Sequence, residues 1–172
     1  MRLTGFVYRA HNPRWAFAPD AGLGAASTGG RFNLMGMPAL YTSRRFETAW
    51  LEAQQGFPFK AQPMTVCAYE VDCEDVLDLT DPDTLEAQGH VPDDLACAWK
   101  DLATRGIKPP TWLLVERLIA NGTAGIIVPS FAAGAGAADI NVVFWDWTPQ
   151  PPHQVRVIDD DGRLPRNDRS WR

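Results

Sequence analysis

Cysteine and histidine are scarce in this 172-residue chain, and their scarcity limits the metal and covalent chemistry that it can support. The three cysteines (Cys67, Cys73 and Cys97) are odd in number and form no C-x-x-C pair. This pattern argues against a disulfide framework and a thiolate zinc site, and it fits a reducing cytosol. Three scattered histidines likewise argue against a catalytic zinc site, so we expect no metal.

Long apolar runs and an excess of positive charge are also missing. No stretch approaches the about 18 apolar residues that a membrane-spanning helix needs, and the first residues show no signal-peptide pattern. The net charge of −5 at pH 7 argues against a groove built for nucleic-acid phosphates. We therefore expect a soluble cytoplasmic protein that binds neither membranes nor nucleic acid directly. Thirteen of the sixteen basic residues are arginine, which reflects either genomic composition or a use of planar guanidinium groups for phosphate.

What the chain does contain is enough apolar sequence for one folded domain. Hydrophobic residues make up 45% of it and seven residues are tryptophan, a composition that excludes a disordered chain. No internal repeat or long linker divides the sequence. We expect one domain over residues 1–158, followed by a charged tail over 159–172 that is either a solvated terminus or a partner-binding arm.

Hydrophobic patterning predicts an α+β fold. Strands do not alternate regularly with helices, which favours a single domain with a twisted, mostly antiparallel mixed β core flanked by a few helices. Helices are predicted at 46–53, around 95–102 and at 112–120, with Thr42 or Ser43 as the first N-cap. Loops are expected in the glycine-rich segments 18–38 and 132–139. The predicted strands are 6–8, 39–41, 65–71, 125–128, 142–147 and 155–158.

Several reaction classes lack their motifs. Residues 22–27 resemble a dinucleotide-binding fingerprint only weakly, because the third glycine is absent and no buried strand precedes them. The chain has no P-loop sequence. Ser130 lies in Val-Pro-Ser-Phe-Ala and not in a G-x-S-x-G elbow, which argues against a serine hydrolase.

Four polar residues stand out in mostly apolar surroundings. Arg31 follows two glycines, where a bare backbone lets a ligand approach, and Tyr41 ends a short predicted strand. Glu52 lies about 120° from the apolar stripe of its predicted helix, and Ser130 follows a predicted strand. Each has a simpler interpretation: an ion-paired arginine, a core tyrosine, a solvated helix flank and a turn cap. Only their combination indicates a site.

The combination resembles the RES domain, a family named for its Arg, Glu and Ser that supplies toxins of bacterial toxin–antitoxin modules. The resemblance covers roughly residues 5–158, nearly the whole chain. Phe32 stands where tryptophan is common in that family, a change that keeps an aromatic ring and loses its N–H. The motifs that carry the resemblance are Gly-Gly-Arg-Phe-Asn at 29–33, Ala-Leu-Tyr at 39–41, Glu-Thr-Ala-Trp-Leu-Glu at 47–52, Val-Pro-Ser at 128–130 and Asn141.

The resemblance implies consumption of NAD⁺ on a fold similar to the diphtheria-toxin-like ADP-ribosyltransferases. It implies a site of Arg31, Tyr41, Glu52 and Ser130, and an Xre-type antitoxin partner that blocks this site. We expect a toxin that transfers ADP-ribose from NAD⁺ to a cellular protein and arrests growth. The first alternative is a glycohydrolase or phosphorylase that depletes free NAD⁺, and the second is a non-catalytic module that binds a nucleotide or a protein.

The residue types suit this chemistry. Cleavage of the nicotinamide–ribose bond places positive charge on the ribose in an oxocarbenium-like transition state, which a carboxylate such as Glu52 can stabilise. The face of Tyr41 can stack on the cationic nicotinamide ring. Arg31 can hold the pyrophosphate, and Ser130 can bind the ribose or orient Glu52. Two further candidates for binding NAD⁺ are Arg9, at the end of the first predicted strand, and Asn141.

Overall fold

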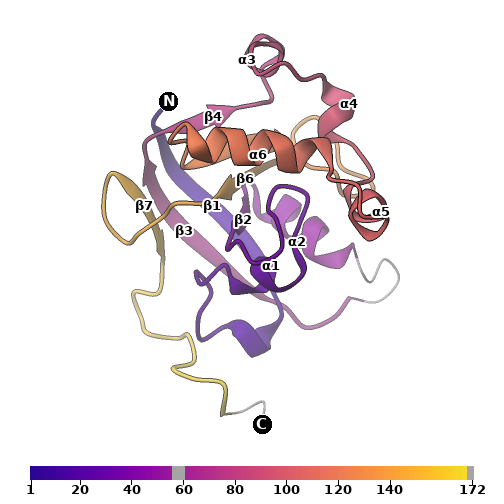
Figure 1. Cartoon of the computed structure of the whole chain (residues 1–172). Coiled ribbons are helices and arrows are strands. Elements are labelled where there is room, and N and C mark those ends of the chain that lie inside the picture. Colours follow the sequence, from indigo (N-terminus) through magenta and orange to yellow (C-terminus); the bar gives the residue numbers. More distant parts are fainter. Residues whose placement is uncertain (56–60, 170–172) are drawn as a thin grey trace.

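One seven-stranded sheet forms the centre of the computed structural model, which describes residues 1–55 and 61–169. The strand order is β4-β5-β6-β2-β1-β3-β7, and every neighbouring pair is antiparallel except β4 and β5 (Figure 1). The predicted α+β class with a mostly antiparallel mixed sheet is therefore confirmed. The strands are β1 (Leu3–His11), β2 (Leu40–Ser43), β3 (Thr65–Cys73), β4 (Val76–Asp78), β5 (Gly125–Pro129), β6 (Ile140–Phe144) and β7 (His153–Val157).

The two faces of this sheet carry two separate hydrophobic clusters. Helix α6 lies across one face, where its Leu114 packs with Val128 of β5 and Val143 of β6 (Figure 1). The opposite face carries Tyr69 and Val7 in the second cluster. Side chains alternate between faces along a strand, so these two clusters assign every strand residue to what we call the α6 face or the Tyr69 face.

The helices are short and lie in the connections between strands. Among them α2 and α6 are the longest in the described part of the chain, and both were predicted from apolar periodicity. The α-helices are α1 (Leu23–Thr28), α2 (Phe46–Gln54), α3 (Pro82–Ala87), α4 (Pro92–Leu95), α5 (Trp99–Thr104) and α6 (Pro110–Ala120), and one 3₁₀ turn spans Pro13–Trp15.

Several predicted boundaries are wrong. The segment expected to be one helix around 95–102 is two helices, α4 and α5, and the glycine-rich segment 18–38 contains α1. Strand β6 ends at Phe144, because Trp145 and Trp147 leave the sheet and donate their indole N–H groups to the carbonyls of Phe32 and Asp20. The elements β4 and α3 were not predicted, since both are too short to show a period.

Helix α2 is oriented differently from the prediction. Its N-cap is Arg45, without a side-chain cap, because Thr42 and Ser43 remain in β2. Phe46 and Trp50, expected on the buried stripe, are 50% and 36% exposed. Ala49, also on the predicted stripe, is buried as expected and is joined by Thr48, and their small side chains allow the helix to approach the sheet closely.

The chain after β7 remains in contact with the sheet. Ile158 donates its backbone N–H to the carbonyl of Ala68, and Leu164 packs against the cluster on the Tyr69 face. The carboxylate of Asp159 accepts the backbone N–H groups of Arg163 and Leu164, which folds the segment back as a turn. No helix in the described ranges 1–55 and 61–169 is long and apolar enough to cross a membrane.

Candidate active site

The carboxylate of Glu52 is the centre of the polar cluster on the α6 face. Its Oε1 atom accepts two hydrogen bonds of 2.5 Å, one from Ser130 Oγ and one from Asn141 Nδ2. Gln55, one turn along α2, donates to Oε2. Glu52 forms no ion pair with any residue in the described part of the chain, so neutral hydrogen-bond donors orient its carboxylate, and Arg31 acts on it only through longer-range attraction.

Ser130 is placed by the turn that follows β5. Its backbone N–H donates to the carbonyl of Asp139 at 2.7 Å, which closes the loop between β5 and β6. Thr48 of α2 donates to the Asp139 carboxylate at 2.6 Å, and this hydrogen bond is the main cause of a lowered pKa for that carboxyl. The loop is thereby tied to the helix that carries Glu52.

Tyr41 projects from β2 and holds the glycine-rich segment in place. Its hydroxyl donates to Asn33 Oδ1 at 2.8 Å and accepts the backbone N–H of Phe32 at 2.9 Å. Burial raises the pKa of the Tyr41 phenol, so the ring is neutral at physiological pH. A Cβ at Gly30 would lie 2.5 Å from the Tyr41 hydroxyl oxygen, which explains why a residue without a side chain precedes Arg31.

Arg31 is half-buried beside this tyrosine. Its Nη1 atom donates to the carbonyls of Leu95 at 2.9 Å and Cys97 at 2.6 Å, and its Cζ lies 4.4 Å from the ring centroid of Phe131. Burial lowers the pKa of the guanidinium, which nevertheless stays charged at neutral pH. The side chain therefore connects the α4–α5 segment to the site as well as presenting a charge there.

Two cavities meet at these residues. The first has a volume of about 260 Å³, the second about 200 Å³, and both are lined by Tyr41, Glu52 and Asn141. Arg31 faces the second cavity together with aromatic rings, whereas the first is lined by small and hydroxyl-bearing residues. The remaining lining of the second cavity includes Phe32, Trp99 and Phe131, and that of the first includes Tyr8, Ala10, Ser43 and Ala53.

Arg9 is the one candidate whose charged group does not join the others. It lies opposite Cys67 in the β1–β3 register, and its guanidinium donates to the carbonyl of Pro19 at 3.0 Å, the same carbonyl that Tyr69 binds. These contacts place the guanidinium on the Tyr69 face, whereas Tyr41 and Glu52 lie on the α6 face. Arg9 borders the first cavity, but its charge is directed away from Glu52.

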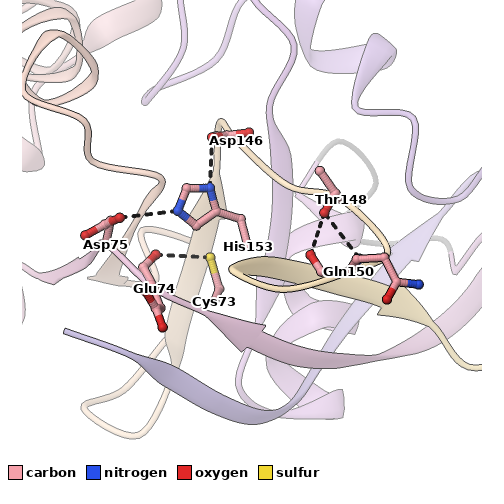
Figure 2. A network of polar contacts seen from close by, with 7 residues as sticks. All are labelled: Cys73, Glu74, Asp75, Asp146, Thr148, Gln150 and His153. Carbon is pink, nitrogen blue, oxygen red and sulfur yellow. Dashed lines mark hydrogen bonds and ion pairs between the residues drawn. The ribbon is translucent and has the colours of Figure 1, made fainter.

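None of the three histidines hydrogen-bonds Ser130, as the general base of a serine hydrolase would, in the described part of the chain. His153 lies between Asp146 (2.8 Å) and Asp75 (3.4 Å), next to the turn that follows Cys73 at the end of β3 (Figure 2). His90 contacts Asp94, and His11 is buried at the end of β1 without a hydrogen-bond partner in the described part of the chain. No group of three or more His, Cys, Asp or Glu residues that could hold a metal ion occurs among the residues 1–55 and 61–169.

A comparison with models of protein families identifies the family to which the residues of this cluster belong. The family model of the RES domain matches residues 6–167. The chain belongs to the RES domain family. RES domains are associated with NAD-related activity of toxin–antitoxin systems, so membership supports an enzyme that uses NAD. A search of curated proteins finds no match to the chain.

The structure thus brings together five of the six predicted site residues, the four implied by the RES resemblance and Asn141, and adds others. Ser43 contacts Asn141 directly, and Gln55 contacts Glu52 directly. Neither residue was predicted to belong to the site. Ser43 would have been found if the predicted strand 39–41 had been extended to its observed end, because residues two apart on a strand lie on the same face. Gln55 lies one turn after Glu52 and could have been found from helical spacing. Phe131 had no local signal, since it reaches the cavity from a separate segment.

Proposed function

We propose that this RES domain cleaves the nicotinamide–ribose bond of NAD⁺ and transfers ADP-ribose to a cellular protein. The observation that carries the proposal is the Glu52 carboxylate, oriented through one oxygen by Ser130 and Asn141 at the wall shared by two cavities. Bond cleavage develops positive charge on the ribose, and an oriented carboxylate that forms no ion pair in the described part of the chain stabilises that charge without reorganising. Oε2 is the oxygen best placed for the ribose, since Oε1 already accepts two bonds.

The surroundings of the carboxylate support NAD⁺ as the substrate. The second cavity offers aromatic side chains, which suit a flat cationic ring, and Arg31, which suits a phosphate or ribose oxygen. Since Nη1 of Arg31 is already bonded to two carbonyls, we expect its other nitrogens to contact the ligand. No step of this reaction requires a metal.

The acceptor of ADP-ribose is inferred from charge and exposure. An inorganic phosphate acceptor needs a cation, yet the Arg9 guanidinium beside the first cavity turns to the opposite face of the sheet. The exposed residues of the 132–138 loop, adjacent to Ser130, form a rim on which a macromolecule could dock. These features favour a protein acceptor; hydrolysis by water, with net loss of NAD⁺, is the alternative.

The partner belongs to the same proposal. A toxin of this kind must be restrained in the cell that makes it, and we propose that an Xre-type antitoxin covers the two cavities. Operator binding would come from the helix-turn-helix of the antitoxin, since the toxin chain has a net charge of −5.

Release of nicotinamide from NAD⁺ tests the proposed reaction. We expect Glu52→Gln to retain the fold and lower the rate by about 10²–10³-fold, because the amide keeps the shape and removes the charge. The matched control is Glu47→Gln on the same helix, whose carboxylate contacts Arg45 at the surface and whose loss should leave the rate unchanged. Equal rates for wild type and Glu52→Gln would refute the assignment.

A second experiment separates the acceptors. Lysate proteins are incubated with the enzyme and NAD⁺ and then examined by mass spectrometry for added ADP-ribose. Modified protein that is absent with Glu52→Gln supports transfer. Nicotinamide release accompanied only by free ADP-ribose indicates hydrolysis, and release dependent on added phosphate indicates phosphorolysis.

A further inference from the structure

Ser43 and Asn141 face each other across the β2–β6 ladder, beneath Glu52. The two residues are directly opposite in register, and Ser43 is only 2% exposed. Its hydroxyl donates to Asn141 Oδ1 at 2.7 Å, while Asn141 Nδ2 donates to Glu52 Oε1 at 2.5 Å. The three side chains therefore form a chain of hydrogen bonds that runs from the sheet to the carboxylate.

The direction of this chain follows from the chemistry of its members. An ionised carboxylate only accepts hydrogen bonds, so the amide must present its NH₂ end to Glu52. Its carbonyl end then faces the interior of the strand pair, where an unpaired acceptor is costly. The hydroxyl proton of Ser43 satisfies that acceptor. Without it, the amide would have to turn or shift toward another donor, away from Glu52.

We infer that Ser43 is a positioning residue, which fixes the Asn141 amide so that Asn141 and Ser130 together hold the Glu52 carboxylate. This inference rests on the proposed function of Glu52. It assigns Ser43 no contact with NAD⁺, since its single hydroxyl proton is used on Asn141. Removal of the Ser43 hydroxyl should slow the reaction only by disturbing the orientation of the Glu52 carboxylate.

The neighbouring residue provides a matched control. Thr42 is equally buried and its hydroxyl donates to the carbonyl of Val142 at 2.9 Å. Because Thr42 is adjacent to Ser43 on β2, its side chain projects from the other face of the sheet. Thr42→Val removes a buried hydrogen bond from the same strand without touching the chain that leads to Glu52.

The kinetic test measures nicotinamide release. We expect Ser43→Ala to lower kcat about tenfold with KM changed less than about twofold, because the loss concerns orientation in the transition state. Ser43→Thr, which keeps the hydroxyl, should restore kcat, and Thr42→Val should leave it unchanged. In an Asn141→Ala background, Ser43→Ala should have no further effect. An equal loss in that background, or no loss in the wild-type background, would overturn the inference.

A second measurement tests the role of Ser43 without relying on enzymatic activity. In ¹⁵N-labelled protein, Glu52→Gln should shift the side-chain amide resonances of Asn141, because the two groups are in contact. In a Ser43→Ala background the same substitution should have little effect on them, since the amide has turned away. Equal shifts in both backgrounds would overturn the inference. Wild-type protein that releases no nicotinamide would refute the proposed function alone, and this spectrum would still decide the role of Ser43.

Discussion

Arg31 binds the carbonyls of Leu95 and Cys97 and, under the proposed function, also contacts NAD⁺. The same nitrogen, Nη1, donates to two carbonyls of the α4–α5 segment, and the guanidinium carbon lies 4.4 Å from the ring centroid of Phe131. This arrangement uses the planar shape of the group as well as its charge. An ammonium group has no such plane and a different reach, so it would conserve the charge and lose the geometry.

Arg31→Lys should therefore weaken NAD⁺ binding. We expect an affinity about tenfold lower, roughly 1.4 kcal/mol, with Arg31→Ala lower again. Calorimetry in a Glu52→Gln background measures binding without turnover. Arg105→Lys at the C-cap of α5 is the control, because Arg105 pairs with Asp101 at the surface and its replacement should leave the affinity unchanged. Unchanged affinity for both Arg31 variants would show that Arg31 serves only to hold residues 95–97.

At the residue scale, the sequence predicts which residues belong to the site better than it predicts the direction in which each side chain points. Arg31, Tyr41, Glu52, Ser130 and Asn141 lie together, as the motifs indicate. The position of Arg9 at the end of a strand carried no information about which face its side chain takes, and the register against Cys67 turns it to the Tyr69 face. Roles in binding and catalysis stay predictions.

At the scale of elements, β1 ends in a buried group that titrates. His11 is 9% exposed, and neither ring nitrogen has a hydrogen-bond partner in the described part of the chain. Burial, and secondarily the charge of Arg9, lowers the pKa of His11 from 6.5 to about 4. The folded protein thus keeps this imidazole neutral at a pH where an unfolded chain would protonate it.

The free energy of unfolding of the protein should consequently depend on pH. Above about pH 6.5 both states hold His11 neutral and it has no effect; between about 6.5 and 4 the unfolded state binds the extra proton and is favoured. We expect roughly 2–3 kcal/mol of unfolding free energy to be lost across this window. His11→Leu should flatten the loss, as measured by urea unfolding at pH 7.5, 5.5 and 4.5. An unchanged slope in that window would assign the acid sensitivity to other groups.

Periodicity in the sequence predicts the long elements and fails where side chains compete for tertiary contacts. The period of α2 is visible, yet its buried side is set by the small residues Thr48 and Ala49 and not by Phe46 and Trp50. Likewise the tryptophans after β6 read as strand residues, but their N–H groups are satisfied by carbonyls of the N-terminal loops. Neither the buried side of α2 nor the end of β6 is determined by the residues of that segment alone.

At the scale of the whole molecule, the proposed reaction should be harmful to a cell. We expect expression without a partner to arrest bacterial growth, and Glu52→Gln to be tolerated at equal soluble protein, because arrest follows the chemistry and not the folding load. Co-expression of the antitoxin should restore growth. The measurement is growth after induction with soluble protein quantified in parallel; arrest by Glu52→Gln at matched levels would separate toxicity from this site.

The contacts of Glu52 also set the moment at which a newly made chain acquires its site. Its two orienting donors, Ser130 and Asn141, lie 78 and 89 residues further along the chain. During translation the carboxylate emerges from the ribosome long before them and cannot be oriented until β6 has been synthesised. A nascent chain, or one terminated before β6, should thus be inactive, and under the proposed function an antitoxin would need to capture only chains that contain β6.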